Sequence, residues 1–333
     1  MRKQLGVSIA LLAGTLTSAP VSALTVDPFY AGVYSAASVG SVPGLPTPYG
    51  GLAFLDSDTI VIGGSANTAS GRIYQIDVVR DADSHITGFS GSASAFRGGT
   101  IGEYNDGGVV FGPGGVLFTS RWPVNGLGQT KPGSIDEDKI IDLTGVTASS
   151  NSAIGFVPSG FAGAGSVKLV SWSGGQWYDA ALAPDGSGTY VLLGVTQVDV
   201  DPVAPGTQNV PGGPEGFVFI SDSNALFDVD SMLIAEYSAG SIGAYELDAD
   251  GNPLVNTRRS FITGLSGAEG AAIDPVTGDF LFSTFGGANQ IVVVKGFLPP
   301  EPPTPGVPEP ASLALLGLGL AALAVARRRR PAA

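Results

Sequence analysis

Two stretches of the chain, Ser166–Gly186 (SVKLVSWSGGQWYDAALAPDG) and Ser231–Gly251 (SMLIAEYSAGSIGAYELDADG), align with each other without a gap. Both contain two apolar runs separated by turn residues, and both end in an Asp-Gly pair. Apolar runs of this length with turn residues between them are typical of β-strands, and Asp-Gly is typical of the turn to a further strand. The alignment therefore predicts that one β-rich unit is repeated along the chain.

The beginning of this unit recurs five times. The starts are Gly51–Phe54, Gly108–Phe111, Gly155–Val157, Gly216–Phe219 and Gly270–Ile273, which lie 57, 47, 61 and 54 residues apart. A repeat of about 50 residues that carries four strands is typical of a β-propeller blade. We therefore predict an all-β propeller of five four-stranded blades. Six blades are one alternative, because residues 98–152 are long and poorly periodic, and an irregular pair of β-sandwiches is another.

The last repeat contains only three expected strands and ends at Ile291–Val294. The run Phe29–Tyr34 near the other end of the chain belongs to no repeat. We expect this run to supply the missing fourth strand, because such a closure joins the two ends of the ring and removes exposed strand edges.

The composition excludes several kinds of chemistry. The 333 residues include no Cys and a single His, His85, so disulfides, a thiolate nucleophile and Cys-ligated metals are ruled out. Residues 24–326 hold 10 basic and 29 acidic side chains, a net charge of −19. A surface this acidic repels nucleic acid and anionic lipid headgroups. Any metal must bind to oxygen ligands.

The first 23 residues have the pattern of an export signal. Arg2 and Lys3 precede an apolar run, Pro20 interrupts it, and small residues lead up to Ala23. This pattern predicts a signal peptide over residues 1–23, removed by signal peptidase after Ala23. We expect the propeller to occupy residues 24–298.

The other end has three parts. A Pro-rich linker at residues 299–307 is followed by Pro308-Glu309-Pro310, by the apolar stretch 311–326, and by the arginines 327–330. As a helix the apolar stretch would be about 24 Å long, which makes it a short transmembrane helix. The arginines (Arg327, Arg328, Arg329 and Arg330) are expected to stay in the cytoplasm and stop transfer of the chain.

Residues 308–333 resemble the PEP-CTERM sorting signal of Gram-negative bacteria, with Pro308, Glu309 and Pro310 on the motif itself. The resemblance implies processing by an exosortase, a membrane-embedded enzyme that cuts near the motif. It also implies an intermediate anchored in the inner membrane, and delivery to the cell surface or the outside in strains that make exopolysaccharide. The alternative is an ordinary membrane anchor that is never cut.

The sequence lacks the familiar catalytic signatures, including the G-x-S-x-G, phosphate-loop and H-E-x-x-H patterns. His85 follows a polar segment and is expected in a surface turn rather than in a triad. Asp248–Gly251 is expected to form a turn, since its Gly is misplaced for a calcium loop. The acidic run Asp136–Asp138 is expected to be a solvated loop.

Glu215 and Glu269 each lie in a Gly-x-Glu-Gly sequence just before an expected first strand, 54 residues apart. First strands line the channel of a propeller, so the two carboxylates are expected at one mouth of it. There they would either form hydrogen bonds in turns or bind calcium. These units are similar to blades of propellers related to gluconolactonases. That resemblance implies a metal-ligand role for such a Glu and a lactonase activity.

From the sequence we expect a protein that is not an enzyme and needs no cofactor, with calcium as the candidate ion. It would interact with exopolysaccharide or matrix proteins at the cell surface. The alternative is a calcium-dependent lactonase or other hydrolase at the channel mouth. Trp122, Trp172 and Trp177 would suit stacking on sugars if exposed, but burial between blades is expected for each.

Overall fold

The structure is a computed structural model that describes residues 23–201, 203, 209–287 and 289–300. Within these ranges no helix is long and apolar enough to cross a membrane. The signal peptide up to residue 22, the linker from residue 301, the sorting motif, the expected transmembrane helix and the arginines lie outside the described residues.

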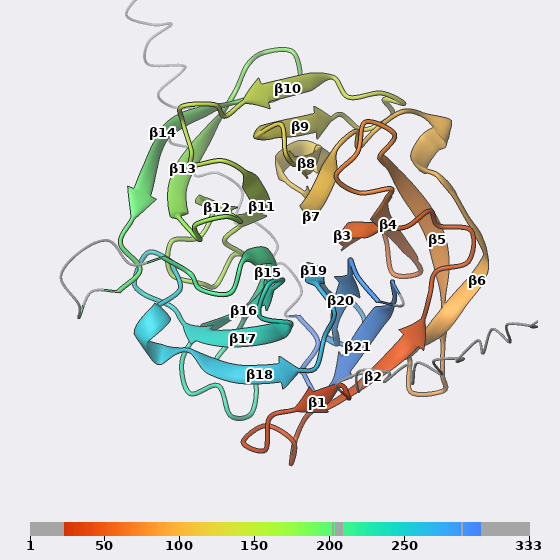
Figure 1. The fold of residues 1–333 in the computed structure, drawn as a ribbon, viewed down its shortest axis with the longest axis vertical. Coiled ribbons are helices and arrows are strands. Elements are labelled where there is room, and N and C mark those ends of the chain that lie inside the picture. The colour runs from red at the N-terminus through yellow and green to blue at the C-terminus, as the bar shows by residue number, and fades with distance from the viewer. Residues whose placement is uncertain (1–22, 202, 204–208, 288, 301–333) are drawn as a thin grey trace, which may run out of the picture.

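Five antiparallel sheets surround a central axis as the blades of a propeller, which confirms the predicted fold and the count of five (Figure 1). The innermost strands are β3 (Tyr49–Phe54), β7 (Asn105–Phe111), β11 (Asn151–Phe156), β15 (Pro214–Ile220) and β19 (Ala268–Ile273). Each of them contacts the next around the axis, so together they form the wall of the channel.

The remaining strands continue each blade outward. They are, by blade, β4 (Thr59–Gly64), β5 (Arg72–Arg80) and β6 (Ile86–Ala95); β8 (Leu117–Arg121), β9 (Gly126–Thr130) and β10 (Lys139–Asp142); β12 (Val167–Ser171), β13 (Trp177–Pro184) and β14 (Tyr190–Val198); β16 (Ser231–Glu236), β17 (Ser241–Glu246) and β18 (Arg259–Thr263); β20 (Phe280–Thr284) and β21 (Ile291–Lys295). Short 3-10 helices lie at Phe96–Gly98, Pro113–Gly115 and Val255–Thr257.

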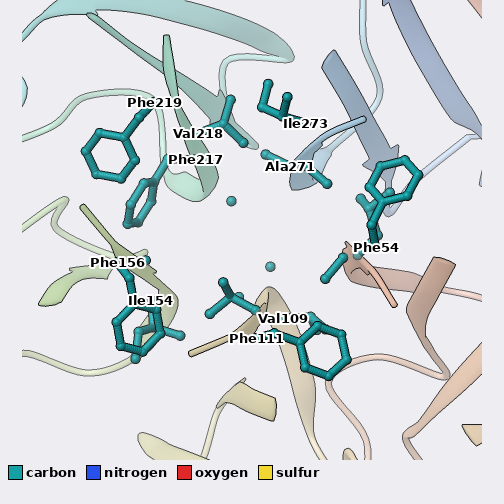
Figure 2. Close-up of a pocket in the computed structure, with 18 of the residues that line it drawn as sticks. Phe54, Val109, Phe111, Ile154, Phe156, Phe217, Val218, Phe219, Ala271 and Ile273 are labelled. Atoms are coloured by element: carbon teal, nitrogen blue, oxygen red, sulfur yellow. The ribbon is translucent and has the colours of Figure 1, made fainter. Parts of the chain in front are cut away.

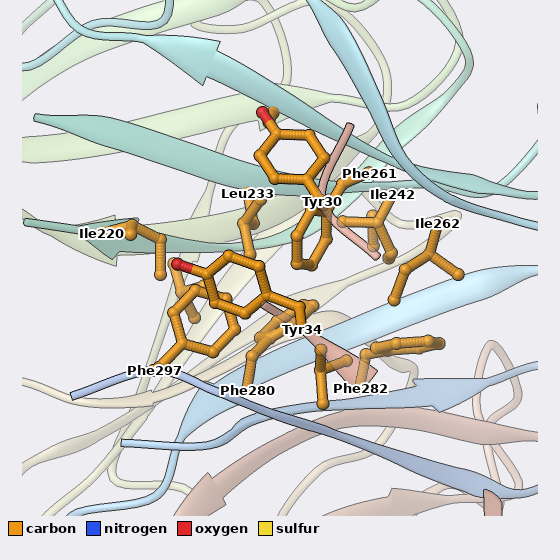
Figure 3. Close-up of a cluster of buried hydrophobic side chains, with 14 of the residues drawn as sticks. Tyr30, Tyr34, Ile220, Leu233, Ile242, Phe261, Ile262, Phe280, Phe282 and Phe297 are labelled. Atoms are coloured by element: carbon orange, nitrogen blue, oxygen red, sulfur yellow. The ribbon is translucent and has the colours of Figure 1, made fainter. Parts of the chain in front are cut away.

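The N-terminal segment closes the ring, but not with the run expected from the sequence. The fourth strand of the last blade is β2 (Ser35–Gly40), which pairs with β21, and β1 (Thr25–Val26) adds a fifth strand beside β18. The run Phe29–Tyr34 forms a turn instead, because its aromatic side chains are needed for packing. Tyr30 and Tyr34 are buried in an aromatic cluster with Phe261, Phe280 and Phe297 (Figure 3).

The glycines that start the repeats are explained by how closely the innermost strands approach one another. A Cβ atom on Gly51 would lie 2.4 Å from the carbonyl oxygen of Gly107, and one on Gly270 would lie 2.5 Å from the Cα of Gly51. No side chain fits at these positions. The third start is displaced: Gly155 lies near the end of β11, and the strand begins four residues earlier, at Asn151.

Candidate functional site

Three carboxylates meet inside the channel. Asp106, Glu215 and Glu269 are the second residues of β7, β15 and β19, and each of these strands has an irregular register just after its start. Such β-bulges redirect side chains out of the regular alternation. One carboxylate oxygen from each residue lies within 4.8 Å of the other two.

These carboxylates are buried, with exposed fractions of only 1% for Asp106, 3% for Glu215 and 1% for Glu269. Both oxygens of Asp106, both of Glu269 and Oε2 of Glu215 have no hydrogen-bond partner among the described residues. Buried polar atoms normally have partners, because leaving an ionised carboxylate uncompensated is costly. The cluster is therefore incomplete without protons or a cation.

The burial and proximity of the three groups disfavour their charged forms. Burial raises the pKa of Asp106 to about 7. Burial also raises the pKa of Glu215 well above its usual value, and the negative charges of Asp106 and Glu269 add to this effect. The pKa of Glu269 is raised well above its usual value by burial and by Asp106. A cation between the groups would remove this penalty by stabilising the ionised carboxylates.

The spacing of the oxygens suits a divalent cation. Calcium binds oxygen ligands at about 2.3–2.6 Å, so two oxygens on one ion are at most about 5 Å apart. The three carboxylates satisfy this limit. Calcium takes about six to eight oxygen ligands, so three carboxylates would leave positions for water or for a ligand's hydroxyl groups.

The other end of the channel is apolar. A pocket of about 320 Å³ extends from Gly107 and Gly216, beside the carboxylates, to the far ends of the innermost strands. Phenylalanine side chains from several blades surround it there, as Figure 2 shows for Phe54, Phe111 and Phe156. Three of the innermost strands, β7, β15 and β19, therefore present carboxylates near their starts, and four of them, β3, β7, β11 and β15, present phenylalanines near their ends.

Of the predicted site residues, the structure brings Glu215 and Glu269 together, and their metal role stays a prediction. Sequence reasoning missed Asp106, which lies in Asn-Asp-Gly-Gly rather than in Gly-x-Glu-Gly. The sequence feature that could have indicated Asp106 is its position two residues before the repeat start at Gly108. The register of β7 is irregular over a longer segment, between Asn105 and Val109, so the sequence does not show that Asp106 is equivalent to Glu215 and Glu269.

Other candidates have structural roles. His85 contacts the buried Asp279 through Nδ1 at 2.6 Å, which links the first and last blades. Asp248 accepts backbone hydrogen bonds in a turn, as expected. The Asp136–Asp138 run is not simply solvated, since the largely buried side chain of Glu137 pairs with Arg121.

Two of the three tryptophans differ from the expectation of burial. Trp177 is fully buried, and Asn252 accepts a hydrogen bond from its Nε1. Trp122 and Trp172 are only half-buried, and they immediately follow β8 and β12.

One comparison with known proteins concerns the C-terminal tail. Residues 306–330 match the PEP-CTERM protein-sorting motif. The chain is thus an exported protein, targeted to an exosortase as its processing partner, that is anchored transiently at the membrane and then sorted to the cell surface. A search of curated proteins finds no match to the chain.

Several solved structures are similar to the body. An auxiliary nutrient binding protein from Bacteroides ovatus is 10% identical, with a TM-score of 0.43 over 79% of this chain and 76% of that one. A candidate 6-phosphogluconolactonase from Bacteroides uniformis is 14% identical, with a TM-score of 0.41 over 76% and 69%. A PQQ-bound aldose sugar dehydrogenase from Streptomyces coelicolor is 12% identical, with a TM-score of 0.38 over 77% and 82%. At such identities these similarities assign no ligand or activity to this chain.

Proposed function

We propose that this protein is an interaction module of the cell surface or the extracellular matrix. In this proposal Asp106, Glu215 and Glu269 hold a calcium ion that completes its working face. The observation that carries the proposal is the group of three buried carboxylates with unpartnered oxygens within 4.8 Å of one another. The sorting motif supports the location, because it directs the chain to the surface.

The proposal includes the division of the chain expected from its sequence. A signal peptide at residues 1–23 is removed by signal peptidase, the propeller occupies 24–298, and a linker at 299–307 leads to the sorting signal at 308–333. A helix at about 311–326, followed by Arg327–Arg330, holds the chain in the inner membrane until the exosortase acts.

Calcium is the ion we favour over softer metals. The cluster offers only carboxylate oxygens, and hard cations such as calcium prefer oxygen ligands. The chain has no Cys and its one His, His85, pairs with Asp279 away from this site.

The test is the thermal midpoint of the purified exported chain with and without calcium. A hundredfold excess over the dissociation constant stabilises the folded state by about 2.7 kcal/mol, so the midpoint should rise. The double substitution Glu215→Gln and Glu269→Gln should abolish the rise, whereas Asp83→Asn, at an exposed position, should leave it intact. A midpoint that calcium does not move in the unaltered chain would rule out the ion.

A hydrolase that acts on lactones is a second candidate, favoured by one observation. A calcium ion held by the three buried carboxylates would polarise the carbonyl group of a lactone as a Lewis acid. We would measure hydrolysis of a panel of sugar lactones with and without calcium. Turnover that Asp106→Asn abolishes would support the hydrolase, and absence of turnover across the panel would leave the binding role alone.

A further inference from the structure

The residue that follows the second strand occupies an equivalent place in each blade. These residues are Ser65, Trp122, Trp172, Tyr237 and Phe285. In the last four, the backbone N–H donates a hydrogen bond to the residue immediately before the innermost strand of the same blade: Tyr104, Ser150, Gly213 and Gly267, respectively. The repeated geometry therefore places an aromatic side chain at the same position in four consecutive blades.

The four aromatic rings form a continuous arc. The ring centroids are 6.3 Å apart between Trp122 and Trp172, 6.1 Å between Trp172 and Tyr237, and 5.7 Å between Tyr237 and Phe285, and each pair meets edge to face. All four side chains are half-buried, so each keeps a part of its surface open to solvent. In the first blade Ser65 takes the position, which leaves the arc open on one side.

The aromatic arc, defined as Trp122, Trp172, Tyr237 and Phe285, borders the carboxylate end of the channel. A Cβ on Gly213 would lie 3.0 Å from Nε1 of Trp172, and one on Gly267 would lie 2.8 Å from the Tyr237 ring. These glycines precede Glu215 and Glu269 by two residues. The pKa of Tyr237 is raised by burial and by the negative charges of Glu269, Glu215 and Asp106. The Tyr237 hydroxyl therefore lies close enough to all three carboxylates to interact with them electrostatically.

The arc and the carboxylates favour one kind of ligand chemistry. Aromatic faces carry the negative part of the ring quadrupole and attract cations, and they also pack well against apolar ring surfaces. Three carboxylates with one calcium ion keep a net negative charge, and residues 24–326 carry −19 in total. An anionic sugar such as a uronate would be repelled from this end, whereas a cationic sugar would be attracted.

We propose that the aromatic arc and the carboxylate cluster bind amino sugars with free ammonium groups, in a cationic polysaccharide of the matrix. The ammonium groups face the aromatic rings and the acidic channel mouth, and the sugar rings pack along the arc. This inference rests on the proposed function in that it takes the carboxylate end as the working face. It does not require calcium, because the aromatic rings and the net charge of −19 over residues 24–326 attract ammonium groups without the ion.

The experiment compares two oligosaccharides of equal length, a glucosamine oligomer with free amines and its N-acetylated, neutral counterpart. Each is titrated into the exported chain at a pH at which the amines are protonated, and binding is followed by calorimetry and by tryptophan fluorescence. Two of the three tryptophans, Trp122 and Trp172, lie in the arc, so their emission reports on it directly. We expect the free-amine oligomer to bind at least about tenfold more tightly than the neutral one.

Substitutions separate the arc from the rest of the surface. Trp172→Ala should weaken binding of the free-amine oligomer at least about fivefold, and Tyr237→Leu provides a second variant if the first does not fold. Phe29→Ala is the matched control, since Phe29 is exposed and lies outside the arc. Equal binding of the two oligomers, no binding of either, or full binding by the folded arc variants would overturn the inference.

The outcome is distinguishable from that of the proposed function. If calcium fails to raise the thermal midpoint but the free-amine oligomer binds selectively, the calcium site fails and the amino-sugar inference stands. If calcium raises the midpoint but the two oligomers bind equally, only the amino-sugar inference fails.

Discussion

The two ends of the propeller channel are built by the same five strands yet differ in what they need. At one end Asp106, Glu215 and Glu269 are buried without partners for their oxygens. At the other end Phe156 packs against Phe118 and Phe217 packs against Trp177, each a residue of the neighbouring blade. The apolar end is therefore stable by its own packing, whereas the acidic end depends on protons or a cation from solution.

The largest expected effect comes from the apolar side. Phe217 is 8% exposed, and its ring centroid lies 4.9 Å from that of Trp177. Phe217→Ala should lower the free energy of unfolding by about 3–5 kcal/mol, because it leaves a cavity in the packed wall. Chemical denaturation should give the same loss with and without calcium. If the loss of unfolding free energy in Phe217→Ala depends on calcium, the two ends of the channel are not independent.

A smaller effect should appear in the pH dependence of the acidic end. A carboxyl group whose pKa is raised on folding binds its proton more tightly in the folded state, so the stability it contributes is lost as pH rises through the folded pKa. For Asp106 the window runs from 3.8 to about 7. Without divalent cations, the free energy of unfolding should therefore fall across this window.

Asp106→Asn should reduce this fall by at least about 1.4 kcal/mol, the equivalent of one pKa unit. Calcium should also reduce it, since the ion stabilises the ionised groups. Denaturation of both proteins at a series of pH values measures the difference. If the two pH profiles have the same slope, Asp106 does not titrate as its burial indicates.

The repeat made most of the fold predictable from the sequence. At four of the five repeat starts, Gly51, Gly108, Gly216 and Gly270, the glycine lies where innermost strands nearly touch, so these start positions recur in the sequence as well as in space. The predicted closing strand was wrong, because packing between segments distant in the sequence decides which run pairs with the last blade. The run Phe29–Tyr34 is rich in residues typical of a strand, but Tyr30 and Tyr34 pack into the aromatic cluster between blades. The neighbouring β2 closes the ring instead.

The candidate site was only partly predictable for a related reason. Glu215 and Glu269 share a local sequence, so their equivalence could be read directly. Asp106 reaches the same place through a longer irregular segment of β7, and no local pattern shows how far a bulge shifts a side chain. The aromatic arc was also only partly predictable: Trp122 and Trp172 suited stacking on sugars, but Tyr237 and Phe285 differ from them in residue type and the first blade carries Ser65 at this position.

The number of calcium ions that bind to the exported chain in a calorimetric titration near neutral pH tests the carboxylate site most directly. We expect one ion for each chain, release of protons as the carboxylates ionise, and no binding after Glu215→Gln and Glu269→Gln together. Asp83→Asn should bind calcium as the unaltered chain does. No calcium bound to the unaltered chain, or equal binding by the double variant, would rule out a calcium site at these carboxylates.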